Sequence, residues 1–193
     1  MTAEPIAPGA PPWSPDPVRQ RLADFTIEDV LAVPDDAPRV ELVDGVMRAV
    51  PSPTIAHQSI GFLLCGWLRT NCPDHLTANI ALGVATGANN TCEADVLLHR
   101  ADVGLDRHFL MPEDVTIVVE IVSPGTRRRD RMEKPAVYAG AGIPYFWRVE
   151  QDPVRVYAYT LKNGTYVELA DSAEELVLDE PFPIRLPIRQ ITP

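Results

Sequence analysis

The sequence lacks the common signals of a secreted or membrane-spanning protein. Its 193 residues include only three cysteines, Cys65, Cys72 and Cys92, with no CxxC pair. An odd number without that spacing indicates neither a disulfide framework nor a thiolate zinc site. No apolar run approaches the roughly 20 residues that cross a bilayer, and the first residues have neither the basic start nor the apolar run of a signal peptide. We therefore expect a cytoplasmic protein.

Several enzyme motifs and a general excess of positive charge are also absent. The sequence has no GxSxG, GxxxxGK[ST] or HExxH motif. It therefore lacks the signatures of serine hydrolases with a nucleophile elbow, of P-loop nucleotide-binding proteins and of zinc proteases. Its net charge of −10 argues against extended contact with nucleic acid, because phosphate binding needs local positive charge. The one concentrated basic stretch is "RRRDR", with Arg127, Arg128, Arg129 and Arg131. These arginines could contact a phosphate backbone or form an ordinary solvated charge run.

The chain divides into a short tail and one domain. Proline, alanine and glycine dominate the first 17 residues without a hydrophobic period, so we predict a flexible tail over 1–17 and a single domain over 18–193. Thr26 predicts the start of a short helix, and Asp44-Gly45 predicts a hairpin turn. Helical spacing of apolar residues predicts the main core helix between Thr54 and Cys72.

Alternating patterns in the rest of the chain predict a sheet. A helical segment interrupts these patterns after residue 130. The predicted strands cover residues 77–87, 91–100, the run around Glu120, 145–150, 154–160 and 165–170. Because strands both precede and follow the helices, we expect an α/β fold with a mixed sheet and helices packed against it.

Two acids lie inside predicted strands. Glu120 interrupts the β-branched run "TIVVEIV", and an unpaired carboxylate in an apolar core costs several kcal/mol, so it needs a cation, a metal or a proton as partner. Asp95 shares a strand face with Glu93 and Leu97. Neighbouring strands that each carry one acid could hold a shared Mg²⁺ or Mn²⁺. Alternatively, Glu120 pairs with an arginine of 127–131 and Asp95 lies at a hydrated strand end.

The order of polar residues carries a family resemblance. It consists of Glu41 in "VELVDG", His57, Asp95 in "ADV", Glu120 in "VEIVSPGTRRRD" and Lys134 in "EKPAVYAGAGIPYFWRVE". From about residue 25 to 166, this series resembles the Uma-type family of restriction-endonuclease-like proteins in the PD-(D/E)XK nuclease superfamily. The resemblance implies a restriction-endonuclease-like core with helices on both sides of a mixed sheet. It also implies that the protein hydrolyses the phosphodiester bonds of nucleic acid, most readily DNA, and that it uses Mg²⁺ or Mn²⁺. Related nuclease folds often pair, so we also expect a homodimer.

The resemblance further implies a role for each residue. Asp95 and Glu120 would be the metal ligands. The superfamily's lysine normally lies two residues after the glutamate, where this chain has Val122, but the Uma-type pattern places it on the next helix, at Lys134. Pro135 would remove a backbone hydrogen bond and crowd the preceding turn of a helix that began at Arg131, so we expect the helix to start later, with Pro135 in its first turn.

Two further residues complete the expected site. Glu41 would be an additional acid, and His57 would donate to a phosphate or assist proton transfer, unless it is a structural histidine. Two functions remain open at this point. One is a metal-dependent endonuclease, and the other is a nuclease-like fold without cleavage activity that serves as a binding or assembly module.

Overall fold

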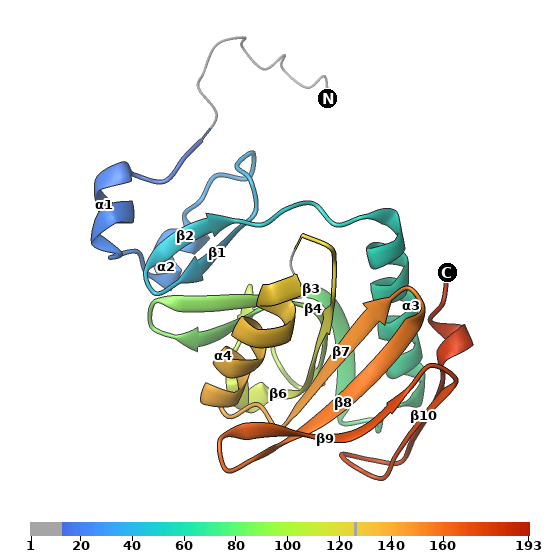
Figure 1. Ribbon diagram of the computed structural model, residues 1–193. Helices are drawn as coiled ribbons and strands as arrows, with labels where there is room; N and C mark the ends of the chain where they lie inside the picture. The colour runs from blue at the N-terminus through green and yellow to red at the C-terminus, as the bar shows by residue number, and fades with distance from the viewer. Residues whose placement is uncertain (1–12, 126) are drawn as a thin grey trace, which may run out of the picture.

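A computed structural model describes residues 13–125 and 127–193 (Figure 1). The predicted tail over 1–17 therefore lies mostly outside the described residues. The α-helices are α1 (Pro17–Leu22), α2 (Ile27–Leu31), α3 (Ile55–Asn71) and α4 (Lys134–Gly140), with a π-helical turn, η2 (Arg129–Glu133), and 3₁₀ turns η1 (Pro112–Asp114) and η3 (Ile188–Gln190). The strands are β1 (Val40–Val43), β2 (Val46–Ala49), β3 (Leu76–Gly87), β4 (Asn90–Arg100), β5 (Phe109–Leu110), β6 (Val115–Ile121), β7 (Tyr145–Gln151), β8 (Val154–Lys162), β9 (Thr165–Ser172), β10 (Glu175–Leu178) and β11 (Ile184–Pro187).

The centre of the fold is a seven-stranded mixed sheet in the order β5-β3-β4-β6-β7-β8-β9. Neighbouring strands run antiparallel except for two parallel pairs, β3 with β5 and β6 with β7. A parallel pair needs a long crossover, and η2 with α4 supplies it between β6 and β7. The expected α/β fold with a large mixed sheet is confirmed.

Both faces of this sheet are covered (Figure 1). In β4, Val96 and Leu98 point into the core beneath α3, whereas Leu97 points to the core beneath α4. This alternation is the one expected of a strand buried on both sides. Leu64 of α3 and Tyr138 of α4 are both fully buried in these two cores.

Local signals in the sequence set the element boundaries. Thr54 caps α3 and accepts a hydrogen bond from the His57 amide. The turn between β1 and β2 contains Asp44 (φ 50°) and Gly45 (φ 72°), the conformation that favours this dipeptide in tight hairpins. Pro135 is the second residue of α4, but the expected late start of the helix is wrong, because the backbone is already helical over residues 127–133, of which the last five form the π-helical turn η2. Among the described residues, no helix has the length and apolar character needed to cross a membrane.

Candidate active site

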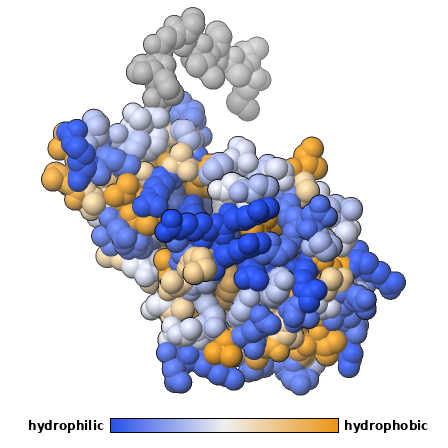
Figure 2. All heavy atoms as spheres, viewed as in Figure 1, coloured by the Kyte–Doolittle hydropathy of each residue, from blue (hydrophilic) through white to orange (hydrophobic). Residues whose placement is uncertain are grey.

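A cavity of about 720 Å³ opens where α3, β4, β6 and the start of α4 meet. In Figure 2, hydrophilic atoms gather over the segment that leads into α4. The five residues predicted to form the site all line this cavity: Glu41, His57, Asp95, Glu120 and Lys134. They come from β1, α3, β4, β6 and α4, so only the folded chain brings them together.

Two side chains of α4, Lys134 and Tyr138, donate hydrogen bonds to the Glu120 carboxylate. Glu120 is 1% exposed. Lys134 Nζ donates to Oε2 at 2.7 Å, and the Tyr138 hydroxyl donates to Oε1 at 2.5 Å. Lys134 also donates to the Glu93 carbonyl at 2.7 Å. Among the described residues, the alternative that an arginine of 127–131 pairs with Glu120 is therefore wrong.

Burial dominates the electrostatics of this cluster. Burial raises the pKa of Glu120, the positive charge of Lys134 opposes this shift, and the negative charges of Asp95 and Asp130 add to it. Burial alone would lower the pKa of Lys134, but the charge and hydrogen bond of Glu120 together with the charge of Asp95 and the effect of Cys92 outweigh burial, and the pKa rises, so the ammonium stays protonated. Burial also raises the pKa of Tyr138 well above its usual value, which keeps its hydroxyl a donor.

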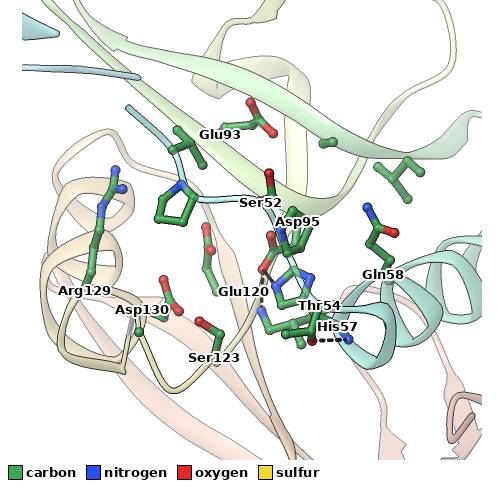
Figure 3. A pocket seen from close by; sticks show the side chains of 18 of the residues that line it. Ser52, Thr54, His57, Gln58, Glu93, Asp95, Glu120, Ser123, Arg129 and Asp130 are labelled. Carbon is green, nitrogen blue, oxygen red and sulfur yellow. Dashed lines mark hydrogen bonds and ion pairs between the residues drawn. The ribbon is translucent and has the colours of Figure 1, made fainter. Parts of the chain in front are cut away.

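Asp95 lies beside Glu120 on the neighbouring strand. Val96 pairs with Val119 in the antiparallel ladder of β4 and β6, so the next step of this register places Asp95 opposite Glu120, on the same face. Asp95 Oδ2 accepts a hydrogen bond from the Ile121 amide at 2.7 Å. Figure 3 shows the Asp95 and Glu120 side chains directed into the same space. The predicted pair of strand carboxylates is therefore present.

Ala81, on the other side of Asp95, has a strained backbone. In the ladder of β3 and β4, Ile80 pairs with Val96 and Leu82 with Ala94, so Ala81 falls opposite Asp95. It has a φ of 51°, a left-handed conformation that costs a non-glycine residue about 1 kcal/mol or more. Ala81 also lines the cavity, so this strain lies at the candidate site.

His57 reaches Asp95 from α3. Its Nε2 lies 3.2 Å from Asp95 Oδ2. Burial by itself lowers the pKa of His57, but the hydrogen bond and charge of Asp95 outweigh burial and raise it. His57 thus contacts a predicted metal ligand instead of projecting into the core.

Glu41 links the N-terminal hairpin to the cluster. It is 2% exposed, and its Oε1 accepts a hydrogen bond from the Glu93 amide at 3.0 Å. It also forms an ion pair with Arg129 and lies 3.8 Å from Lys134 Nζ. These contacts make Glu41 a support for the basic side chains of η2 and α4.

The four predicted phosphate-contacting arginines divide into two groups. Arg129 is committed to Glu41, and Arg131 makes a bidentate contact with Glu150 at 3.0 and 2.8 Å. Arg127 and Arg128 are exposed, and Arg128 Nε lies 3.4 Å from Glu133 Oε1 in a surface ion pair. Of the four, only Arg129 lines the cavity.

The sequence reading missed Tyr138. Its hydroxyl completes the contacts of the Glu120 carboxylate, and a signal for it existed. Tyr138 lies four residues after Lys134, and residues with that spacing share a helix face. Once Lys134 was placed on a helix beside Glu120, Tyr138 was the next side chain able to reach the same acid.

Asp95 and Glu120 are the residues that could hold a divalent cation. Among the described residues, no group of three or more histidine, cysteine or acidic side chains is arranged to hold a metal ion. Mg²⁺ does not require such a cage, because it keeps several waters and is commonly bound by one or two carboxylates together with phosphate oxygens. The carboxylates of Asp95 and Glu120, side by side at one cavity, fit that donor chemistry.

Comparisons with known proteins agree with this geometry. The family model Uma2, described as "Putative restriction endonuclease", matches residues 27–189. The fold is similar to the crystal structure of "a putative nuclease belonging to DUF820" from Anabaena variabilis, with a TM-score of 0.67 and 16% sequence identity over 86% of this chain and 97% of that one. No curated protein sequence matches this chain.

Proposed function

Because the chain belongs to the Uma2 family of putative restriction endonucleases, we propose that its cavity hydrolyses phosphodiester bonds of nucleic acid, DNA in the first instance, with Mg²⁺ or Mn²⁺. One observation carries the proposal. Asp95 and Glu120 lie on adjacent strands and both line one cavity, and the Lys134 ammonium lies 2.7 Å from Glu120 Oε2. Two carboxylates and a protonated lysine are the groups that metal-assisted phosphate hydrolysis uses.

The acids and the lysine have separate roles in this proposal. Asp95 and Glu120 would hold the cation, which when bound supplies positive charge to the phosphate and favours deprotonation of the attacking water. Lys134 stays protonated and is fixed by Glu120 and the Glu93 carbonyl. It therefore orients the attacking water or stabilises negative charge that develops on the phosphate.

Three other side chains position this machinery. Tyr138 holds the second oxygen of Glu120. Glu41 holds Arg129 and lies near Lys134. His57 contacts Asp95 Oδ2, so it orients that carboxylate and can donate to a phosphate oxygen when protonated.

The substrate backbone would be held by exposed positive charge near the cavity. Arg127 and Arg128 lie between two cavity-lining residues, Gly125 and Arg129, and Arg128 is 89% exposed at its side chain. Phosphate contacts of this kind fix position without reading sequence. We also propose that the protein is a homodimer, and light scattering of the purified protein measures the mass of the particle directly.

One observation favours the competing function, a binding or assembly module without cleavage. Each of the three Arg and Lys side chains that line the cavity is paired with an acid. These pairs are Arg39 with Glu93, Arg129 with Glu41 and Lys134 with Glu120. Paired charges can serve as structural ion pairs alone, so the two functions need a direct test.

The test measures cleavage of single- and double-stranded DNA and RNA with Mg²⁺ or Mn²⁺. We expect metal-dependent cleavage by the wild type, its loss in Asp95→Ala and a large decrease in Lys134→Ala. Asp106→Ala, which removes an exposed acid, is the matched control and should cleave normally.

Melting temperatures measured with and without the metal give a second readout. Binding to the folded state raises the melting temperature by linkage, and Asp95→Ala should remove that rise. Absence of both cleavage and metal-induced stabilisation in the wild type would favour the binding module.

A further inference from the structure

The cavity has an exposed apolar rim that the proposed hydrolysis does not use. Phe62 of α3 is 70% exposed and Ile80 of β3 is 49% exposed, and both line the cavity. On the inner side of the same helix, Ile60 and Leu64 are fully buried. Large apolar side chains exposed inside a concave site commonly mark a binding surface.

Helix geometry places this rim next to the acids. His57 and Gly61 are four residues apart on α3, and His57 contacts Asp95. Gln58 and Phe62, each one position further, form the adjacent row on the same helix. Figure 3 shows Gln58 and His57 on one side of the cavity and Arg129 on the opposite side. The wall formed by α3 therefore carries Phe62 beside the polar Gln58 and His57, and the opposite, charged wall carries Arg129.

A nucleotide presents both chemistries at once, since its phosphate is charged and the face of its base is flat and apolar. We propose that Phe62, which lines the cavity together with Ile80, stacks on an unpaired nucleobase beside the phosphate that a cation at Asp95 and Glu120 would hold. The proposal rests on the proposed function and deepens it. It makes the preferred substrate a single strand, or a duplex with a displaced base.

Stacking explains why the substrate must be unpaired at this position. In a regular duplex both faces of each base are covered by neighbouring base pairs, so no face is available to a side chain. Single-stranded binding sites combine a charged path for the backbone with aromatic rings for the bases, independently of sequence. The cavity carries this combination, with Arg129 and Lys134 on the charged wall and Phe62 on the other.

The test measures binding, so it does not depend on cleavage. Fluorescence anisotropy gives the affinity for a labelled single-stranded oligonucleotide and for the matching duplex, with Ca²⁺ in place of Mg²⁺. We expect Phe62→Ala to weaken single-strand binding by roughly tenfold or more, the usual effect of losing one stacked ring. Phe62→Tyr should bind as the wild type does, and Phe62→Leu, which keeps the apolar volume without the ring, should weaken binding. Leu105→Ala removes a fully exposed apolar side chain outside the cavity lining and is the control.

Each outcome separates the two proposals. If the wild type binds the single strand and Phe62→Ala binds equally well, the stacking proposal is overturned and the proposed function stands. If the wild type binds no nucleic acid, both are overturned. If Phe62→Ala changes the mass of the particle in light scattering and leaves single-strand affinity unchanged, the rim is a contact between copies of the chain and stacking is again overturned.

Discussion

Lys134 Nζ lies 2.7 Å from Glu120 Oε2, although the two residues belong to different elements fourteen positions apart. The superfamily pattern places its lysine two residues after the glutamate, where this chain has Val122, which is 4% exposed. Lys134 is instead the first residue of α4, directly after the π-helical turn η2, so its ammonium reaches Glu120 from a helix and not from β6. The ammonium of Lys134 therefore reaches Glu120 from α4, and the residue two positions after Glu120 remains the buried, apolar Val122.

The ion pair of Lys134 and Glu120 should show strong coupling in stability. Lys134→Met leaves a buried carboxylate without its cation, and loss of one partner of a buried pair costs about 3–5 kcal/mol. Adding Glu120→Gln to Lys134→Met removes the unpaired negative charge, and the amide oxygen of the glutamine still accepts the hydrogen bond from Tyr138. We therefore expect the double variant to be less destabilised than the sum of the single variants, as measured by urea unfolding. Additivity within about 0.5 kcal/mol would show that the pair is not coupled.

Tyr138→Phe should destabilise the protein more than loss of an ordinary tyrosine hydrogen bond does. Tyr138 donates to a buried carboxylate, whereas Tyr166 donates to the Ile143 carbonyl at 2.9 Å in the same core. Hydrogen bonds to charged groups contribute about 1.5–3 kcal/mol and neutral ones about 1 kcal/mol. Thermal unfolding of the two Phe variants compares them. Equal losses would mean that the Tyr138 hydroxyl contributes no more than a neutral bond.

Gly45 should tolerate no side chain. Its replacement should destabilise the β1–β2 hairpin and so displace Glu41, which lies on β1. A Cβ at Gly45 would lie 1.9 Å from the Ala23 carbonyl oxygen, and its φ is 72°. We expect Gly45→Ala to lower the free energy of unfolding by more than 1 kcal/mol and to displace the hairpin that carries Glu41. Gly66→Ala, on α3 with no atom within 4 Å of the added carbon, should instead stabilise the protein by about 0.5–1 kcal/mol. Chemical denaturation of both variants measures this contrast.

The sequence predicts most of the strands, and the unusual acids inside them, because the alternation of apolar and polar residues is a short-range pattern. Asp95 and Glu120 are recognisable as acids in apolar strands, and their cross-strand position follows from the pairing of β4 with β6. The pairing of Arg129 with Glu41 was not predictable, because it joins β1 to η2 across a long sequence separation. The strained Ala81 was not predictable either, since its conformation comes from tertiary packing and not from its own propensity.

The hairpin of β10 and β11 shows the same limit in the fold. Its four-residue strands are short, and Pro181 and Pro183 separate them, which weakens the strand signal. Leu176 and Ile184 become fully or almost fully buried only because the hairpin closes the core beneath α3. Their burial is a property of the assembled sheet.

His99 should make the stability of the protein decrease as pH falls below about 6.5. Burial lowers the pKa of this ring below its ordinary value of 6.5, and the charge of Arg69 lowers it further, whereas the Arg100 carbonyl and the charge of Asp114 oppose the shift. Nδ1 donates to the Arg100 carbonyl at 2.8 Å.

Because the folded pKa lies below the unfolded one, the unfolded chain takes up the proton first as pH falls. The contribution of His99 is therefore fully present above pH 6.5 and is lost as pH decreases towards the folded pKa. Urea unfolding at pH 7 and pH 5 should show a larger decrease in stability for the wild type than for His99→Gln, with His108→Gln, at an exposed position, as the control. A wild-type decrease equal to that of His99→Gln would mean that the buried ring accepts its proton as readily in the folded protein as in the unfolded chain.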